Sequence, residues 1–170
     1  SGGGLCGSKL PDAQAAYETA NTLNAALLGG VNFMLHSCGW LEGGLVASFE
    51  KFVMDADHLG TLQKMALGVA ADENGQAMGA IREVGPSGHY LGCDHTQQNF
   101  KSAFWRSNLF DYKPFETWYE EGARDTYTLA AERVTHQLAS YRQPPLDPEI
   151  LAALEKYVVD KKAAMPDAFV

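Results

Sequence analysis

The sequence lacks any cluster of basic residues. It carries 13 Lys and Arg against 21 Asp and Glu, a formal net charge of −8. A protein that binds nucleic acid needs a basic surface to neutralise phosphates, and a protein that binds an anionic membrane surface needs one for the same reason. We therefore expect neither nucleic acid nor a membrane among the partners.

Cysteine is scarce, and long apolar runs are absent. The three cysteines, Cys6, Cys38 and Cys93, are odd in number and scattered, so they predict no disulfide framework. We expect a reducing, cytoplasmic location. The longest mostly apolar run, residues 25–35, is shorter than the roughly 20 residues that span a bilayer. No basic segment followed by an apolar one opens the chain, so a secretory signal is not indicated.

The 170 residues, 46% of them hydrophobic, suffice for one domain with its own core. Helical periodicity and the breaks between periodic segments predict most of the elements. Helices are expected after Pro11-Asp12 as far as Gly29-Gly30, over about 44–67, over about 78–84, near 118–141, and from Pro148 onward. The short apolar run 31–36 lies between glycine breaks and predicts a buried parallel strand.

This order of elements indicates an α/β fold that is rich in helices and poor in strands. Because one strand cannot bury both its faces, we interpret residues 1–170 as a single segment, the C-terminal portion of a TIM (β/α)8 barrel. Residues 1–9 are expected to form its opening loop, and residues 142–170 its C-terminal helix and tail. The opening Ser-Gly-Gly-Gly reads as a loop, which suggests a piece of a longer protein.

Residues 88–96, Gly-His-Tyr-Leu-Gly-Cys-Asp-His-Thr, gather possible metal ligands. If this stretch were extended, His89 and His95 would lie about 20 Å apart and could not hold one ion. The glycines and Pro86 around it argue against a helix. Cys93 and His95, with ligands from elsewhere, remain a feasible zinc pair. The alternatives are polar residues at a strand end and the lining of a substrate pocket.

A second candidate site directly follows the predicted strand. His36 near Cys38 suggests a nucleophilic thiol, although no oxyanion motif accompanies the two. Trp40 beside Glu42 combines an indole face with a carboxylate, which suits a cation that cannot donate hydrogen bonds, such as a quaternary ammonium. The alternative is that Trp40 only packs, and that Glu42 stabilises the N-terminus of the following helix.

Three separated motifs, in order, resemble the trimethylamine methyltransferase (MttB) family. They are Gly-Ser-Lys-Leu-Pro-Asp-Ala-Gln-Ala-Ala-Tyr-Glu at 7–18, Trp-Leu-Glu-Gly-Gly-Leu-Val-Ala-Ser-Phe-Glu-Lys-Phe-Val-Met-Asp at 40–55, and Val-Gly-Pro-Ser-Gly-His-Tyr-Leu at 84–91, followed by His95-Thr96. The resemblance extends from about residue 3 to about residue 157. It corresponds to roughly the C-terminal third of such a protein.

The resemblance implies a TIM-barrel methyltransferase of a methanogenesis-related family. Such an enzyme moves a methyl group from a methylated amine to the cobalt of a separate corrinoid protein. The chain would bind no cofactor directly, because the corrinoid (cobalamin) is presented by that partner. The resemblance also suggests a homo-oligomer, and the segment alone is expected to be inactive.

The resemblance is incomplete at one point. Archaeal trimethylamine enzymes of the family carry pyrrolysine, and this chain shows no such residue. Leu5-Cys6-Gly7 also departs from the Thr/Ser-Asp that usually precedes the Ser-Lys pair. Demethylases of quaternary amines, such as glycine betaine, are therefore the better analogy.

We expect a substrate site built from polar and aromatic groups, without a metal ion and with no catalytic residue assigned. Its predicted members are His36, Trp40, Glu42, His89, Tyr90 and His95. Two alternatives stay open: a metal-dependent barrel enzyme that uses Cys93 and His95, and a helical interaction module.

Overall fold

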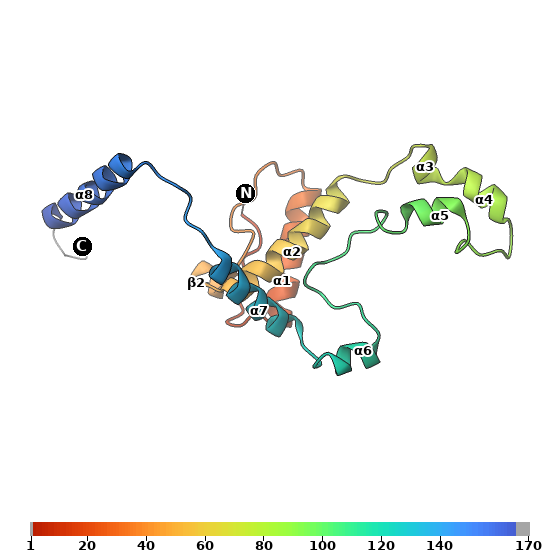
Figure 1. The fold of residues 1–170 in the computed structure, drawn as a ribbon, viewed down its shortest axis with the longest axis horizontal. Helices are drawn as coiled ribbons and strands as arrows, with labels where there is room; N and C mark the ends of the chain where they lie inside the picture. The colour runs from red at the N-terminus through yellow and green to blue at the C-terminus, as the bar shows by residue number, and fades with distance from the viewer. Residues whose placement is uncertain (1, 166–170) are drawn as a thin grey trace. The chain divides into compact units, whose positions relative to one another are not determined.

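The computed structural model describes residues 2–165, which fall into two compact units divided between Gln137 and Leu138. The element order along the chain can be followed in Figure 1. The elements are α1 (Ala13–Leu28), β1 (Trp40–Leu41), the 3-10 helix η1 (Glu42–Gly44), β2 (Val46–Ala47), α2 (Phe49–Ala66), α3 (Glu73–Gln76), α4 (Met78–Val84), α5 (Asp94–Asn99), α6 (Phe115–Glu120), α7 (Thr126–Ser140) and α8 (Pro148–Ala164).

Helix α1 begins and ends where its sequence predicts. The side chain of Asp12 accepts a hydrogen bond from the backbone N–H of Ala15 at 3.0 Å, which satisfies one of the free donors of the first turn. The same bond lowers the pKa of Asp12, and a hydrogen bond from Ser8 adds to the effect. At the other end Gly29 caps the helix through its N–H. The predicted helix is confirmed.

Helix α2 begins later than the periodicity suggests. The sequence predicts a helix from about residue 44, but residues 40–47 form an antiparallel hairpin in which Trp40 pairs with Ala47. Gly43 and Gly44 make its turn with positive φ values of 65° and 96°, which side chains rarely adopt. The apolar residues just before α2 therefore belong to the hairpin.

Ser48 caps α2, and its loss has a measurable cost. Its Oγ accepts a hydrogen bond from the N–H of Lys51 at 3.2 Å. Ser48→Ala should therefore lower the free energy of unfolding by about 1 kcal/mol, while Ser48→Asn, which can still cap, should lower it by only a few tenths. Urea denaturation followed by circular dichroism measures both. Equal losses for the two variants would contradict the capping role.

The predicted strand 31–36 is wrong as a strand. The structure forms one isolated parallel bridge there, between Leu35 and Gly2, and the N–H of Gly3 donates to the Leu35 carbonyl at 3.1 Å. The physical reason is that a strand extends only as far as a neighbour pairs with it. Helix α1 connects the two bridged segments, as the crossover between two parallel strands does. The TIM barrel itself is not formed by the described residues.

A hydrophobic core lies between α1 and α2, which pack side by side (Figure 1). Leu23 of α1 is fully buried and Leu62 of α2 is 5% exposed. Cys6, Ala15 and Leu41 form a further buried cluster that joins the opening loop, α1 and the hairpin. The first loops of the chain are thus held against a two-helix scaffold.

Helix α4 confirms the short helix expected over about 78–84, whereas α5 corrects an expectation. We expected no helix in residues 88–96, because glycine disfavours one. The glycines precede the helix instead: residues 90–93 form a turn, closed by a hydrogen bond from the N–H of Cys93 to the Tyr90 carbonyl, and α5 begins at Asp94. An acidic side chain in the first turn is favourable there.

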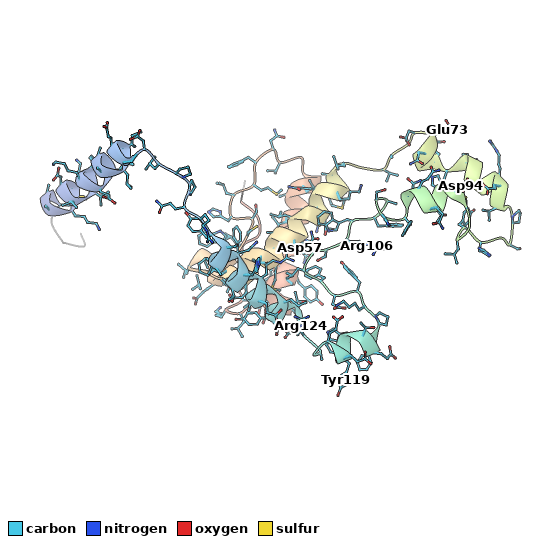
Figure 2. The ribbon with its side chains drawn as sticks, viewed as in Figure 1. Asp57, Glu73, Asp94, Arg106, Tyr119 and Arg124 are labelled. Carbon is cyan, nitrogen blue, oxygen red and sulfur yellow. The ribbon has the colours of Figure 1, made fainter. Side chains whose placement is uncertain are left out.

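The helix expected near 118–141 forms as two helices. Gly122 and Ala123, with φ values of 98° and 50°, interrupt it between α6 and α7. The irregular segment between α5 and α6 is anchored on α2. The N–H of Asn108 donates to Asp57 at 2.9 Å, and Figure 2 labels this aspartate on α2.

The second unit contains α8, which begins where Pro148 predicts. Asp147 caps it, accepting from the N–H of Glu149 at 2.8 Å. Its apolar side chains are more than a third exposed, including Leu151 and Leu154. Of the predicted tail, residues 166–170 lie outside the described residues. Within residues 2–165, no helix has the length and apolar character needed to cross a membrane.

Candidate functional site

Two loops meet on one side of the α1–α2 scaffold. Within the opening segment 1–9, the part called the opening loop from here on (residues 4–9) follows Gly2 and Gly3. The hairpin loop (residues 36–48) follows Leu35, the bridge partner of Gly2. The N–H of Glu42 donates to the Ser8 carbonyl at 2.8 Å. The two loops therefore start from paired segments and lie against each other.

Gly4 permits this close approach. It has a φ of +81°, and a Cβ atom there would lie 2.8 Å from the carbonyl oxygen of His36, too close for any side chain. Its N–H donates to the Thr22 hydroxyl at 3.1 Å, and its carbonyl accepts from the Thr19 hydroxyl at 3.1 Å. Helix α1 thus fixes the start of the opening loop.

A pocket of about 390 Å³ opens beside the hairpin loop. We call it the aromatic pocket, lined by Cys38, Gly39, Trp40, Ala47, Ser48, Phe49 and Phe52. Three aromatic side chains give it an apolar lining. The rings of Phe49 and Phe52 are partly open to solvent, with 67% and 56% of each residue exposed. This pocket is large enough for a small organic cation.

The position of Trp40 is set from two sides. Its carbonyl accepts a hydrogen bond from the Cys6 thiol at 3.2 Å. The ring of His36 lies against its indole in an edge-to-face arrangement, with 5.8 Å between ring centroids. His36 itself is exposed and has a left-handed φ of 58°. His36 and Trp40, two predicted members of the substrate site, are thus in contact, and their role in that site stays a prediction.

Cys38 contributes a neutral sulfur to the aromatic pocket. Burial raises the pKa of its thiol to about 11, and the carboxylate of Asp55 acts in the same direction. A thiol with this pKa is protonated at neutral pH, so it is a poor nucleophile. The earlier alternative of a nucleophilic thiol beside His36 has no support in this environment.

The reactivity of Cys38 tests this environment. Its thiolate fraction at pH 8 should be roughly 100-fold below that of a thiol with the ordinary pKa, so alkylation by iodoacetamide should be slower by about that factor. Peptide mass spectrometry measures the rate, with N-acetylcysteine as the reference thiol. Stability should also fall between about pH 9 and pH 11, because only the unfolded chain releases the proton there. Alkylation at the reference rate would contradict the raised pKa of this half-buried thiol.

A buried ion pair on α2 is hydrogen-bonded to Gly39, which lines the aromatic pocket. Lys51 and Asp55, one turn apart on α2, are 2% and 6% exposed, and their charged atoms are 2.5 Å apart. Burial raises the pKa of Asp55, while the Lys51 ammonium and the N–H of Gly39 oppose that rise. The sequence signal for this pair was available: a lysine and an aspartate at i and i+4 within an apolar helix.

The structure places Glu42 at the first residue of η1, half-buried and with a left-handed φ of 51°. Its backbone joins the two loops, but Glu42 is not among the residues that line the aromatic pocket in the described part of the chain. Phe49 and Phe52 do line it. The sequence placed both residues in the helix expected over about 44–67 and not in the site. Their position in the first turn of α2, directly after the hairpin, is the signal that was missed.

His89, Tyr90 and His95 belong to another part of the first unit. His89 and Tyr90 lie in the exposed segment before α5, and Nε2 of His95 donates to the Asn74 carbonyl at 2.8 Å. His95 also lines an open acidic pocket, whose Glu73 and Asp94 are labelled in Figure 2. The acidic and aromatic pockets share no residue. A single site that contains all six residues stays a prediction.

The described residues form no ligand set for the zinc site that was considered as an alternative. Cys93 is 3% exposed, and its sulfur lies 3.8 Å from a carboxylate oxygen of Glu83, whereas His95 binds Asn74. Nowhere in residues 2–165 do three His, Cys, Asp or Glu side chains converge as metal ligands. Structural zinc needs four such ligands and catalytic zinc three.

A further cavity, of about 260 Å³, lies between α1 and α2. Lys51, Asp55 and His58 reach it from α2, and Phe110 closes one side. Nε2 of His58 is buried there without a hydrogen-bond partner within the described part of the chain. His58 thus packs against this cavity.

The chain is similar to known proteins over nearly its whole length. The family model "Trimethylamine methyltransferase (MTTB)" matches residues 1–166. The chain is 44% identical, over 95% of its length, to a glycine betaine methyltransferase of Desulfitobacterium hafniense. It is 31% identical, over 94% of its length, to a trimethylamine methyltransferase MttB of Methanosarcina barkeri. It is 26% identical, over 84% of its length, to an L-carnitine:corrinoid methyltransferase of Eubacterium limosum.

These matches cover 33%, 32% and 30% of the three relatives, so the chain spans about a third of their length. The family match nevertheless covers nearly the whole chain, including all three sequence motifs. The chain belongs to the trimethylamine methyltransferase (MTTB) family.

Proposed function

We propose that this chain supplies the substrate-binding loops of a methyltransferase that takes a methyl group from a methylated amine, and that the amine is quaternary, such as glycine betaine. The observation that carries the proposal is the aromatic pocket on the hairpin loop of a chain in this family. The similarity to a glycine betaine methyltransferase supports the quaternary amine.

The pocket has the chemistry that a methylated ammonium ion requires. A quaternary ammonium ion has no N–H to donate, so it is held by the faces of aromatic rings, an attraction worth about 0.5–2 kcal/mol per well-placed ring. Trp40, Phe49 and Phe52 offer those rings. The neutral thiol of Cys38 adds polarisable contact without competing as a nucleophile for the methyl group.

The reaction needs no general acid from the protein. A quaternary ammonium leaves as a neutral amine once it has given up a methyl group, so no acid needs to protonate it. The cobalt of a separate corrinoid protein is the proposed methyl acceptor, and two relatives are named as corrinoid methyltransferases. The exposed edge at Phe49 leaves one side of the pocket open to that acceptor. The chain's own residues bind the cation and orient one N–CH3 bond toward the opening.

The proposal includes a TIM barrel, of which this chain forms part. The parallel bridge between Gly2 and Leu35, connected through α1, has the connectivity of one βα unit and the start of the next. The two loops that follow the bridged segments carry the proposed site. In barrel enzymes the active site is built from the loops that follow the strands.

The activity can be tested in a chimera. In it, this chain replaces the matching third of the Desulfitobacterium glycine betaine methyltransferase, the relative with 44% identity. We expect the chimera to methylate cob(I)alamin from glycine betaine, measured by absorbance, and the same chimera with Trp40→Ala to be slower by at least about tenfold. A folded chimera that is inactive with glycine betaine but active with trimethylamine would contradict the proposed substrate.

Two predicted site residues outside the aromatic pocket need their own test. If Glu42 and Tyr90 belong to the substrate site, Glu42→Gln and Tyr90→Ala should each weaken glycine betaine binding by several-fold, roughly the worth of one charge or ring contact. Isothermal titration calorimetry measures both. His136→Ala, on α7 and outside every predicted site, is the control. Unchanged affinity in either test variant removes that residue from the site.

A further inference from the structure

The buried pair of Lys51 and Asp55 calls for an explanation beyond stability. Both residues are more than nine-tenths buried. Taking two charges out of water costs so much that a buried pair often stabilises a protein no better than apolar residues of the same size. The remaining hydrogen bonds of the pair lead to the proposed site.

Asp55 is hydrogen-bonded directly to one of the two site loops, and Lys51 reaches the other through Thr19 of α1. Oδ2 of Asp55 accepts the N–H of Gly39 at 2.8 Å, in the hairpin loop. Nζ of Lys51 donates to the Thr19 hydroxyl at 2.9 Å, and that hydroxyl donates to the Gly4 carbonyl at 3.1 Å, at the start of the opening loop. One ion pair on α2 therefore holds both loops.

Gly39 is the point at which this network reaches the aromatic pocket. Its N–H is bound to Asp55, and its carbonyl accepts the N–H of Ser48 at 2.9 Å, so both its backbone polar groups are held. Its φ is +80°, and a Cβ there would lie 3.1 Å from the Cβ of Phe52. The backbone of Gly39 is thus held in one conformation against α2. The residue that follows Gly39 is Trp40.

We infer that Asp55 is a positioning residue of the methyl-donor site: it holds Gly39, and through Gly39 it sets the direction of Trp40. Lys51 keeps the carboxylate oriented toward that amide. Asp55 is not among the pocket's lining residues in the described part of the chain, so it acts through the loop and not on the ligand. The inference rests on the proposed function, because it assumes that the aromatic pocket binds the methylated cation.

Two double variants separate positioning from charge. Lys51→Met with Asp55→Asn removes both charges but keeps a side-chain oxygen that can accept from Gly39. Lys51→Met with Asp55→Leu removes both charges and the acceptor. Neither variant leaves a lone buried charge, so both avoid the largest penalty.

The probe is tetramethylammonium, titrated by calorimetry into the chain as part of the chimera described above. Protection of the Gly39 amide against hydrogen exchange is followed by NMR. We expect the Asn variant to keep Gly39 protected and to bind within about threefold of the unmodified chain. The Leu variant should lose the protection and bind at least about tenfold more weakly, because a misplaced ring no longer faces the cation.

The outcomes can be told apart. If the unmodified chain does not bind tetramethylammonium, the proposed function fails, and the inference with it. If it binds, and the Leu variant binds equally well after losing Gly39 protection, only the inference is overturned. Should the Leu variant not fold, the Asn variant decides: full affinity with Gly39 protected supports positioning, and weakened affinity with Gly39 protected overturns it.

Discussion

Lys51→Met alone should lower the free energy of unfolding by about 3–5 kcal/mol, a loss at the upper end of what single substitutions produce. The variant removes the ammonium 2.5 Å from Asp55 but leaves the carboxylate 6% exposed. An uncompensated charge in that environment must either be hydrated, which opens the α1–α2 interface, or be protonated. The loss is a large share of the roughly 5–15 kcal/mol that stabilises a typical domain.

The matched control is the double variant Lys51→Met with Asp55→Leu. It loses the same ammonium but leaves no charge behind, so it should be destabilised far less than the single variant. Urea denaturation at neutral pH, followed by circular dichroism, measures both. If the single variant is no less stable than the double variant, the carboxylate is not buried as the structure has it.

The second large effect concerns ligand binding. Trp40→Ala should weaken tetramethylammonium binding by about 10- to 30-fold, because it removes the ring with the strongest attraction for a cation. Trp40→Phe keeps a ring in the same place and should weaken binding by only about threefold. Calorimetry on both variants gives the comparison.

The control for Trp40 is Trp118→Phe on α6, whose indole N–H donates to the Arg124 carbonyl at 2.9 Å away from the aromatic pocket. It should leave the affinity unchanged. Equal weakening for Trp40→Ala and Trp118→Phe would mean that the loss reflects general destabilisation, not the pocket.

Sequence reasoning predicted most helices because their signals are local. Asp12 and Gly29 mark the ends of α1, and Pro148 marks the start of α8, each through its own backbone chemistry. Their bounds follow from residues within one turn of the helix ends. Such signals need no knowledge of the rest of the fold.

The errors arose where distant partners decide the structure. The run 31–36 has the composition of a strand, but within residues 2–165 it pairs only as a bridge between Leu35 and Gly2. A strand is stabilised by neighbours, which local composition does not specify. The second half of the hairpin, from about residue 44, was likewise read as helix, because the pairing of Trp40 with Ala47 leaves no mark in the local helical periodicity.

The candidate site was predictable in part. The combination of Trp40 with a charged neighbour indicated a cation site, and the structure places Trp40 in an aromatic pocket. Phe49 and Phe52 were missed because a helical stripe usually faces a core, and here its first turn faces a pocket. The hydrogen bond between Asp55 and Gly39 joins residues that are 16 apart in the sequence, and no local sequence pattern predicts it. The cytoplasmic location and the homo-oligomeric state stay predictions from the sequence.

The most direct test of the central claim compares two ligands of one shape. Glycine betaine carries a trimethylammonium group, and tert-butylacetate has the same outline and carboxylate with carbon in place of the cationic nitrogen. Calorimetric titration of the chain should give glycine betaine the tighter binding by at least about tenfold, and Trp40→Ala should abolish most of that difference. Equal binding of the two ligands would contradict an aromatic pocket that recognises the positive charge of the methyl donor.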